Sequence, residues 1–374
     1  MIVQVPLFCL RHGKASGLES AVLNLVRGFA QIGTPVTLPI ASVNRLNPDF
    51  ANWVEQQRGV TFQKYPMIRG GTWTRFFDET MFLNTTEQMG PILFPNYFLP
   101  PTFNGRSSST FCFIHDCQHR VFPQFFSKRR RLWLDFAFRR SLNKAAHVLL
   151  ISEFEKAQIA RFFGEKAADH CTVVYNAIDW SRYAFGSVSP TIESISEHQY
   201  ILSVSHQYAH KNTEAIIDAF RLLADIYSDL NLVLVGRESQ NVSNRINAIE
   251  NKSVRERIIS TGFVSDVDLG RLYTKCQLFV LASEYEGFGM SAVEAMGFGV
   301  PVIVTKGSSL PEVTLGKATY VEPKSSPSVW SDAISEHLSR QRDELALRNA
   351  AIEVRTRFQP ESVAKSVLKC LITY

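Results

Sequence analysis

Short apolar runs alternate with stretches of helical periodicity along the whole chain. In the first half, the apolar runs of strand length cover residues 1–10, 35–40, 60–65, 92–95, 110–114, 147–152 and 172–175. In the second half they cover 200–205, 230–235, 258–264, 277–282 and 301–305. Apolar positions recur at helical spacing between them, as over 18–32, 212–223, 329–338 and 345–357. Strands that alternate with helices predict an α/β fold with mostly parallel sheets, whose strand order the pattern leaves open.

The two halves of this pattern are separated by residues 180–199, which are rich in Ser, Pro and Glu and show little periodicity. Such a composition is typical of a linker. We therefore expect a first domain over 1–179 and a second over 200–357, followed by a last helix within 358–374. A chain of 374 residues is long enough for two domains that each bury a core.

The composition is that of a soluble globular protein, with 45% apolar and 20% charged residues. The net charge of +5 is too small and too scattered to predict nucleic-acid binding. The six cysteines show neither zinc spacing nor a disulfide framework, which favours a reducing cytoplasm. Because no apolar run approaches 18 residues and the start lacks a signal-peptide pattern, we expect a cytoplasmic protein that does not span a membrane.

Candidate chemistry is densest at residues 283–301, which read S-E-Y-E-G-F-G-M-S-A-V-E-A-M-G-F-G-V-P after an apolar strand. Gly287 and Gly289 lack Cβ atoms, so the backbone can turn sharply there and approach a ligand closely. The helix expected from Met290 offers unpaired amides and a positive dipole end, which suit a phosphate. An ordinary strand–loop–helix crossover with solvated glutamates is the alternative.

Glu286 and Glu294 flank this loop, one at its mouth and one about a turn into the helix. Carboxylates beside a phosphate site suit hydroxyl groups, which donate hydrogen bonds to them. A sugar or ribose on these carboxylates, with its phosphates on the amides of residues 288–291, would satisfy every partner.

The spacing of these two glutamates, with E-G-F-G between, resembles the E-x7-E signature of the retaining glycosyltransferases of family 4, group 1. Further segments resemble that family: G-L-E at 17–19, with Ser16 in place of a glycine, S-E-F at 152–154, N-A-I-D at 176–179, where Tyr175 and Ala177 depart from the family's pattern, and H-K-N at 210–212. The H-D pair at 115–116 resembles the turn of members that transfer mannose, as bacterial mannosyltransferases do. The resemblance therefore spans both halves of the chain.

The resemblance implies the GT-B fold, in which two Rossmann-like domains with parallel sheets face each other across a cleft. The second domain would bind the nucleotide-sugar donor and the first the acceptor, while the helix in 358–374 would cross back to complete the first. Donor-binding residues carried over from the family are Gly17, His206, Lys211, Arg237, Gly262, Phe263, Val264, Glu286, Gly287, Phe288, Gly289, Met290, Ser291 and Glu294. Catalytic residues carried over are His115, Asp116, Lys211 and Glu286.

Roles also follow from the resemblance. Lys211 would neutralise the leaving diphosphate, Glu286 would hold sugar hydroxyls and Glu294 the ribose. His206 stands where many members carry a second cation, which Arg237 could supply instead. The alternatives are a surface lysine at 211, a structural His115–Asp116 pair in which Asp116 caps a turn, and a plain first crossover at Gly17.

A basic and aromatic stretch lies within residues 122–143, where we expect a helix. Its basic run is Lys128, Arg129, Arg130 and Arg131, followed by Trp133. Basic and aromatic side chains together suit an anionic lipid surface or a lipid diphosphate acceptor. A solvated charged face is the alternative.

The function that this resemblance implies is retaining, metal-independent transfer of a hexose to a glycan or lipid-linked acceptor in cell-surface polysaccharide synthesis, with GDP-mannose as the preferred donor. UDP-hexose or dTDP-rhamnose donors, a sugar-nucleotide 2-epimerase and a two-lobed binding protein without chemistry remain alternatives. An NAD-dependent oxidoreductase is disfavoured because neither half carries G-x-G-x-x-G after its first strand. We expect neither a metal, since cations and helix dipoles can stabilise the leaving diphosphate, nor another cofactor.

Overall fold

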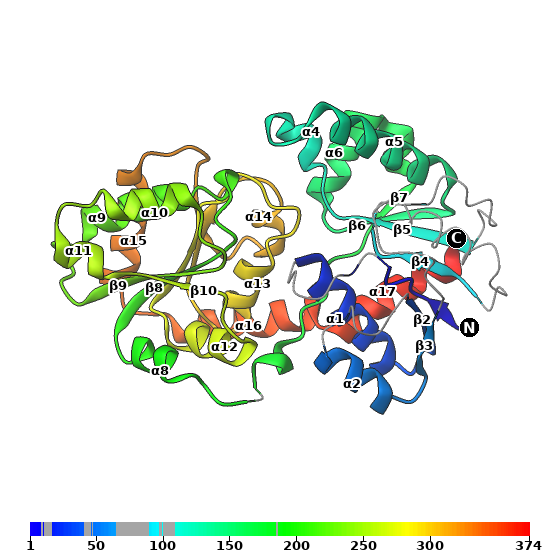
Figure 1. The fold of residues 1–374 in the computed structure, drawn as a ribbon, viewed down its shortest axis with the longest axis horizontal. Coiled ribbons are helices and arrows are strands. Elements are labelled where there is room, and N and C mark those ends of the chain that lie inside the picture. Colours follow the sequence, from blue (N-terminus) through cyan, green and yellow to red (C-terminus); the bar gives the residue numbers. More distant parts are fainter. Residues whose placement is uncertain are drawn as a thin grey trace. The chain divides into compact units, whose positions relative to one another are not determined.

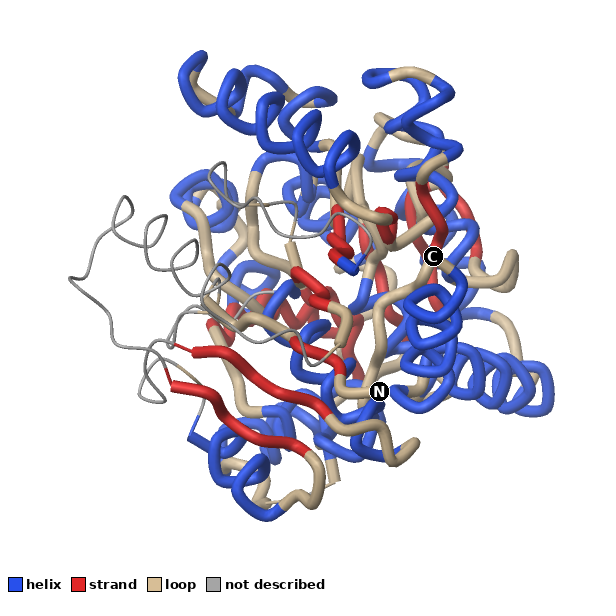
Figure 2. Tube along the Cα trace, turned by 90° about the vertical axis from the view of Figure 1, so that its right-hand side faces the viewer, coloured by secondary structure: helices blue, strands red, loops and turns tan. Residues whose placement is uncertain are grey.

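A computed structural model describes residues 1–8, 10, 17–40, 46, 48–64, 90–96, 99, 109–184 and 186–374. The chain divides into two compact units, one of residues 1–178 with 358–374 and one of residues 179–357. In each unit, helices pack on both faces of a parallel sheet (Figure 1, Figure 2). The expected α/β fold with parallel sheets is therefore confirmed.

The first unit is built on a sheet whose described strands are all parallel and follow the order β3-β2-β1-β4-β5-β6-β7. Their bounds are β1 (Val3–Gln4), β2 (Val36–Ile40), β3 (Val60–Lys64), β4 (Ile92–Phe94), β5 (Thr110–Ile114), β6 (His147–Leu150) and β7 (Cys171–Val173). The chain runs outward from β1 to β3 and then returns to β4 on the other side of β1. In such sheets ligands bind beyond the carboxyl ends of the strands, where the order reverses.

The helices of this unit cover the sheet and bury apolar side chains on it. They are α1 (Gly17–Gln31), α2 (Pro48–Gln56), α4 (Gln118–Val121), η3 (Pro123–Phe125), α5 (Lys128–Lys144), α6 (Glu153–Phe163), α7 (Glu165–Asp169) and α17 (Pro360–Thr373). As expected, the last helix completes the first unit: α17 packs along α1, with Gly28 of α1 against Pro360 (Figure 1).

The second unit repeats the plan. Its described strands are all parallel, in the order β10-β9-β8-β11-β12-β13. Their bounds are β8 (Gln199–Val204), β9 (Leu230–Val235), β10 (Ile258–Gly262), β11 (Leu278–Leu281), β12 (Val302–Thr305) and β13 (Thr319–Val321). The order here reverses between β8 and β11, which are hydrogen-bonded neighbours.

The helices of the second unit lie on both faces of its sheet (Figure 1). They are η4 (Trp180–Tyr183), α8 (Pro190–Ser196), η5 (Ala209–Lys211), α9 (Thr213–Leu223), α10 (Gln240–Asn247), α11 (Lys252–Glu256), α12 (Asp266–Lys275), α13 (Met290–Gly297), α14 (Leu310–Val313), α15 (Pro327–Ser339) and α16 (Glu344–Phe358). The core beneath α9 and α15 contains Phe220 and Trp330, both fully buried.

Residues 180–199, expected to form a linker, instead hold η4 and α8 and belong to the second unit. The low periodicity is explained by the short length of α8, which offers Ile192 and Ile195 as its buried apolar side chains. The helix expected within 122–143 begins only at Lys128, because Pro123 opens a separate turn and Ser127 caps the amide of Arg130. Ser16, which stands where the family has a glycine, lies outside the described residues.

The described cysteines, Cys112, Cys117, Cys171, Cys276 and Cys370, are all buried and unbridged. Across the described ranges, no helix combines the length and the apolar character that crossing a bilayer requires.

The contact between α1 and α17 gives a first prediction. A Cβ atom on Gly28 would lie 2.1 Å from the carbonyl oxygen of Pro360, so Gly28→Ala forces α17 away from α1. We expect the variant to lose about 2 kcal/mol of unfolding free energy, although Ala is normally the better helix former. Urea unfolding, with hydrogen exchange read in α1 and α17, measures this. Gln31→Ala, at the exposed end of α1, is the control, and equal stability of the two variants would contradict the packing.

Candidate functional site

The candidate site of the second unit lies where its strand order reverses. β8 and β11 pair in parallel, with Ile201 opposite Leu278, so the loops that follow them leave the same edge of the sheet. The amide of Glu284 in one loop donates to the carbonyl of His210 in the other, at 2.8 Å. The H-K-N loop and the glycine loop are therefore joined through their backbones.

Lys211 and Glu286 meet at this junction. Although 75 residues separate them, Nζ of Lys211 donates to Oε1 of Glu286 at 2.7 Å. Their side chains are only 17% and 14% exposed, so the pair is far less screened than a surface ion pair. The two residues that the family resemblance assigned to one donor site are thus brought together.

The backbone at Asn212 determines where Lys211 lies. Asn212 has a φ of 48°, in the left-handed region that Asn tolerates better than most residues, and α9 begins directly after it. Asn212 occupies the N-cap position of α9, but within the described part of the chain its side chain makes no capping bond.

Two serines that the sequence analysis did not assign hold the backbone of Glu286. The amide of Glu286 donates to Oγ of Ser308 at 3.0 Å, and Oγ of Ser309 donates to the carbonyl of Glu286 at 2.8 Å. Both serines follow β12, the neighbour of β11 in the sheet. In the sequence these residues appear only as two serines after a strand. That they lie beside Glu286 follows from the pairing of β12 with β11, which only the structure shows.

The start of α13 has the geometry expected of a phosphate site. Gly289 precedes the helix with a φ of 85°, and Phe288 beside it is buried. The first amides of any helix lack carbonyl partners within the helix, and its N-terminal end carries a partial positive charge. The sequence-predicted residues Gly287, Met290 and Ser291 flank this point. The loop can therefore take an anion beside Lys211.

Glu294, one turn into α13, is 4% exposed and held by two partners that the sequence analysis missed. Its Oε1 accepts from Nη2 of Arg182 at 3.0 Å, and its Oε2 accepts from the hydroxyl of Tyr273 at 2.9 Å. Burial, followed by the charge of Glu294, raises the pKa of Tyr273, so its hydroxyl stays protonated and donates. No local sequence pattern indicates these contacts, because η4, α12 and α13 meet only in the fold.

Other predicted donor-site residues cluster around an exposed ring at the end of β10. The guanidinium of Arg237 lies 6.0 Å from the ring centre of Phe263, and the ring of His206 lies 5.3 Å from it. Gly262, with a φ of 69°, accepts from the amide of Gly236 at 2.9 Å, and Val264 follows half-buried. Arg237, expected as a second phosphate cation, therefore faces an aromatic ring in this structure.

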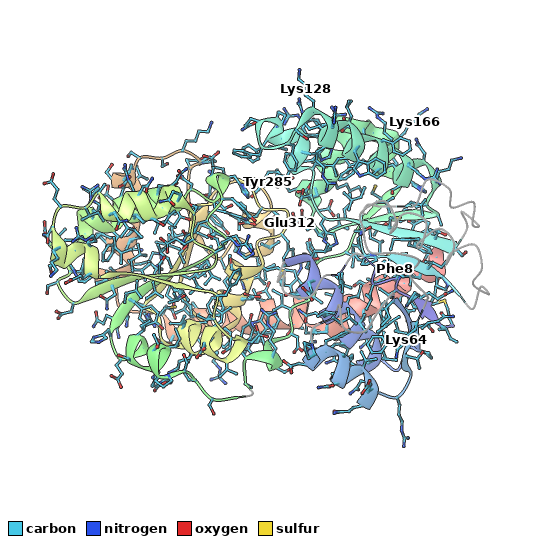
Figure 3. The ribbon with its side chains drawn as sticks, viewed as in Figure 1. Phe8, Lys64, Lys128, Lys166, Tyr285 and Glu312 are labelled. Atoms are coloured by element: carbon cyan, nitrogen blue, oxygen red, sulfur yellow. The ribbon has the colours of Figure 1, made fainter. Side chains whose placement is uncertain are left out.

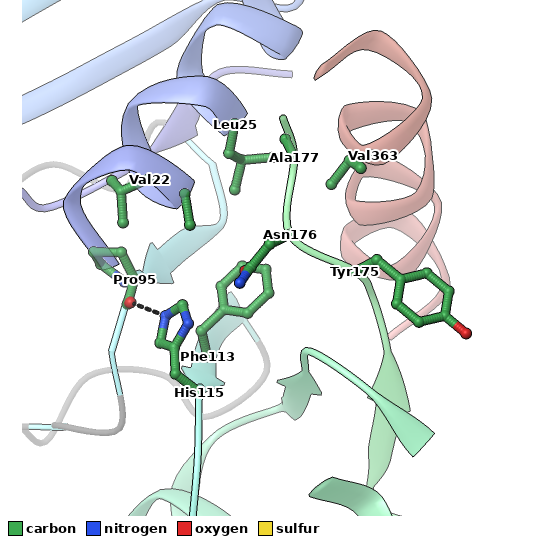
Figure 4. A pocket seen from close by; sticks show the side chains of 10 residues that line it. Val22, Leu25, Pro95, Phe113, His115, Tyr175, Asn176, Ala177 and Val363 are labelled. Carbon is green, nitrogen blue, oxygen red and sulfur yellow. Dashed lines mark hydrogen bonds between the residues drawn. The ribbon is translucent and has the colours of Figure 1, made fainter. Parts of the chain in front are cut away.

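In the first unit, His115 follows β5, and its Nε2 lies 2.8 Å from the carbonyl oxygen of Pro95 (Figure 4). A carbonyl oxygen only accepts, so Nε2 carries the proton and Nδ1 is left as an acceptor. Burial lowers the pKa of His115, against the opposing effects of Pro95 and Asp116, so the ring is neutral at pH 7. The ring lines a cavity of about 20 Å³, which has room for one water.

Asp116 is exposed and makes the capping bond expected of a structural residue, accepting from the amide of Gln118 at 3.0 Å. The same turn is held by the buried carboxylate of Glu155, which accepts from the amide of Cys117 at 3.0 Å. Glu155 follows the S-E-F segment, so that segment supports the H-D turn. Gly17 is the exposed first residue of α1.

The basic run forms the start of α5. Ser127 caps the helix, and Lys128, Arg129 and Arg130 in its first turn are exposed, with Lys128 pointing away from the unit in Figure 3. Arg131 and Trp133 are half-buried. Among the described residues, no group of three or more His, Cys, Asp or Glu side chains could hold a metal ion.

Two family models match the chain, one for each half. The model described as Glycosyltransferase Family 4 matches residues 15–182, and that described as Glycosyl transferases group 1 matches residues 189–354. The chain belongs to the family 4, group 1 glycosyltransferases. The resemblance seen in the E-x7-E, H-K-N and S-E-F segments is confirmed.

Relatives of this glycosyltransferase chain include bacterial mannosyltransferases. It is 29% identical to the O-antigen chain mannosyltransferase B of Escherichia coli over an alignment of 250 residues. That alignment covers 65% of this chain and 63% of the relative. The chain is 27% identical over 221 residues to an O-antigen chain mannosyltransferase of Salmonella typhimurium, covering 59% and 58%. The chain thus matches less than two thirds of the length of these relatives.

Solved glycosyltransferase structures share the fold. HepE of Anabaena, in complex with UDP-glucose, superimposes with a TM-score of 0.73 at 18% identity, covering all of both chains. WaaG, a glycosyltransferase involved in lipopolysaccharide biosynthesis, gives a TM-score of 0.70 at 15% identity, covering 97% of this chain and 98% of WaaG. The expected GT-B fold is confirmed.

The glycine loop of this glycosyltransferase gives a second prediction. A Cβ on Gly289 would lie 2.6 Å from Cδ2 of the buried Leu310, in addition to the strain of a positive φ. Gly299 is the matched control, because its φ of 75° carries the same strain while no described atom lies within 4 Å of the added Cβ. We expect Gly289→Ala to lose about 1 kcal/mol more unfolding free energy than Gly299→Ala, as measured by urea unfolding. Equal losses would mean that Leu310 does not restrain the loop.

Proposed function

We propose that this chain is a retaining glycosyltransferase that transfers mannose from GDP-mannose to a glycan or lipid-linked acceptor in cell-surface polysaccharide synthesis. The observation that carries the proposal is the Lys211–Glu286 pair, set between a helix N-terminus and the edge of the sheet where the strand order reverses. The names of the Escherichia coli and Salmonella relatives support mannose as the transferred sugar.

The pair provides both halves of donor recognition. In the resting arrangement, the ammonium of Lys211 and the carboxylate of Glu286 neutralise each other at 2.7 Å. A donor offers each a better-matched partner: its β-phosphate takes the ammonium, and its sugar hydroxyls donate to the carboxylate. Amides at the start of α13 would stabilise the charge that grows on the phosphate as the sugar leaves.

The transfer step follows from these contacts. The bond between the anomeric carbon and the β-phosphate oxygen breaks while an acceptor hydroxyl oxygen bonds to the same carbon from the same face. The hydroxyl proton passes to the diphosphate that leaves, so the configuration is retained and the atoms balance. Lys211 and the helix dipole supply positive charge where the diphosphate forms, and on this basis we propose transfer without a metal ion.

His115 belongs to the acceptor side of this proposal. Its neutral ring keeps Nδ1 as an acceptor while Nε2–H is held by Pro95. Such a nitrogen can receive a hydrogen bond from a hydroxyl without placing another charge near the reaction. Asp116 would act by fixing the turn that carries His115.

The proposal predicts that Lys211→Ala and Glu286→Ala each lower kcat about 100-fold, the scale of losing one group that stabilises the transition state. Release of GDP from GDP-mannose, measured with EDTA present, reports the rate. Lys317→Ala is the matched control, since it breaks the exposed Lys317–Glu353 pair of the same unit. Wild-type rates in the Lys211 variant would contradict the assignment.

A thermal-shift panel of sugar nucleotides separates the alternatives. A donor at 100 times its Kd adds about 2.7 kcal/mol of stability. Stabilisation by UDP-glucose or dTDP-rhamnose and not by GDP-mannose would show that the proposed donor, GDP-mannose, is wrong. Release of a free epimer without any acceptor would identify a 2-epimerase, and binding without turnover would identify a binding protein.

We also propose that the surface formed by Phe125, Lys128, Arg129, Arg130, Leu132 and Phe136, here called the α5 surface, lies against the anionic cytoplasmic face of a membrane. Leu132 is 71% exposed, Phe136 49% and Phe125 50%, although all three are apolar. Lys128, Leu132 and Phe136 are one helical turn apart and so share a face of α5. Apolar and cationic side chains on one helical face are typical of helices that lie in a lipid interface.

The position of the cations strengthens this proposal. Lys and Arg in the first turn of a helix oppose its dipole, at roughly 0.3–1 kcal/mol each, and that turn of α5 contains no acidic residue. The helix therefore carries these charges at a cost to its own stability. An anionic surface would offset that cost by about 1 kcal/mol for each basic residue.

Vesicle flotation tests the α5 surface. Reversal of Lys128, Arg129 and Arg130 to Glu should weaken binding to vesicles containing phosphatidylglycerol by about two orders of magnitude, and should not unfold α5 because Glu suits a helix N-terminus. Reversal of three exposed lysines of the same unit, Lys64, Lys144 and Lys166, is the charge-matched control. If both reversals weaken flotation equally, net charge and not the α5 surface is responsible.

A further inference from the structure

The carboxylate of Glu294 is held by a segment whose place in the chain is informative. Arg182 lies in η4, directly after the boundary between the two units at residues 178 and 179. Asp179 opens this turn, and its Oδ1 accepts from the amide of Ser181 at 3.0 Å and from its hydroxyl at 2.5 Å. The first segment to cross between the units thus contacts the donor-site helix α13.

η4 fits between α12 and α13 because both helices have a glycine where it packs. A Cβ at position 297 of α13 would lie 2.2 Å from Nε1 of Trp180, and one at position 270 of α12 would lie 2.8 Å from Cβ of Tyr183. Gly270 is inside a helix, where glycine costs about 1 kcal/mol relative to alanine. The absence of side chains at Gly270 and Gly297 allows η4 to lie close to both helices, although Gly270 lowers the stability of α12.

Arg355 of α16 closes the third side of this arrangement. Its Nε donates to the carbonyl of Gly297 at 2.6 Å, and its guanidinium lies 5.5 Å from the ring centre of Trp180. Arg355 precedes the second unit boundary, at 357 and 358. Residues beside both crossings are therefore fixed against the end of α13.

Arg182 connects this packing to Glu294. Its Nη2 donates to Oε1 of Glu294 at 3.0 Å and to the hydroxyl of Tyr183 at 2.5 Å, while its Nε lies 3.7 Å from Asp266. The Arg182 side chain is mostly buried. Burial opposes the charge of Arg182, but Tyr183, Glu294 and Asp266 together raise its pKa above the ordinary value, so it stays cationic.

The Arg182–Glu294 pair reduces the electrostatic repulsion that a bound nucleotide would meet at Glu294. A diphosphate brings negative charge to the start of α13, and an unpaired buried carboxylate one turn along the helix would repel it. The guanidinium removes that repulsion without removing the carboxylate as an acceptor. Arg182 and Tyr273 each occupy one oxygen of Glu294, and each oxygen retains acceptor capacity for a hydroxyl.

We propose that Arg182 is a positioning residue for the donor: it holds the carboxylate of Glu294 in the orientation that accepts the ribose hydroxyls. The inference rests on the proposed function and on the ribose-binding role that the family resemblance implies for Glu294. It adds that recognition of the ribose depends on η4 and therefore on the segment that first connects the two units.

Calorimetric titration of Arg182→Gln with GDP and with its 2′-deoxy and 3′-deoxy forms, and with UDP and its deoxy forms, tests the proposal. Wild-type protein should bind the ribonucleotide about tenfold more tightly than a deoxy form, the scale of one hydrogen bond to a charged group. Arg182→Gln should bind the ribonucleotide about tenfold more weakly and should discriminate against the deoxy forms less than about twofold. Arg182→Lys, which keeps the charge without the planar fork, should recover part of the affinity and little of the discrimination.

Two further variants keep the test decisive if Arg182→Gln lowers stability. Tyr273→Phe removes the hydrogen bond to the other oxygen of Glu294 without leaving a charge unpaired, and it should also reduce the deoxy discrimination. Arg271 lies on α12 like Tyr273 and pairs with Glu193 of α8; Arg271→Gln breaks that pair and should change neither affinity nor discrimination. All titrations are run well below the Tm of each variant.

The outcomes separate this inference from the proposed function. Weaker binding with unchanged deoxy discrimination would overturn the positioning role and assign Arg182 to stability alone, leaving the glycosyltransferase proposal intact. Failure of the wild-type protein to bind either GDP or UDP would overturn the proposed function and this inference with it.

Discussion

The parallel pairing of β8 with β11 is the constraint on which the candidate donor site depends. From β8 the chain continues to β9 on one side, and from β11 it continues to β12 on the other side. Because β8 and β11 are parallel neighbours, the loops that follow them begin side by side at the same edge of the sheet. Lys211 and Glu286 come from those loops, and the backbone bond from Glu284 to His210 joins the loops before any ligand arrives. A different strand order would leave the same side chains on separate parts of the unit.

Each carboxylate near the glycine loop has a cation of a different kind, and the difference fits a different task. Lys211 is a point charge on a flexible stem, so its ammonium can turn from Glu286 to a phosphate without a fixed hydrogen-bond geometry. Arg182 is a planar fork that contacts Tyr183 and Glu294, so its pair with Glu294 keeps one geometry. In the proposed donor complex, the first contact would be exchanged and the second kept.

The sequence predicted those features that follow from local pattern. Apolar runs placed the described strands other than β13, and helical spacing placed α1, α9, α15 and α16, while α2, α10 and α11 were not predicted. The E-x7-E and H-K-N segments indicated the two loops that meet. Arg182, Tyr273, Ser308 and Ser309 could not be predicted, because their meaning depends on which strands and helices are neighbours. Residues 180–199 were assigned to a linker because a helix as short as α8 has too few apolar positions to show a period.

At the end of β5 the first unit presents a neutral side chain, which is consistent with its proposed partner. His115 is uncharged, its outer nitrogen is committed to Pro95, and the cavity beside it has room for one water. An acceptor sugar carries hydroxyls and no phosphate at the reacting end, so a buried cation there would cost desolvation without a charge to meet. Three exposed cations, Lys128, Arg129 and Arg130, lie instead in the first turn of α5, where solvent keeps their desolvation small and a charged lipid surface can still attract them. Charge at these two sites therefore fits the partners proposed for them: paired and enclosed where a nucleotide would bind, and exposed where a membrane would lie.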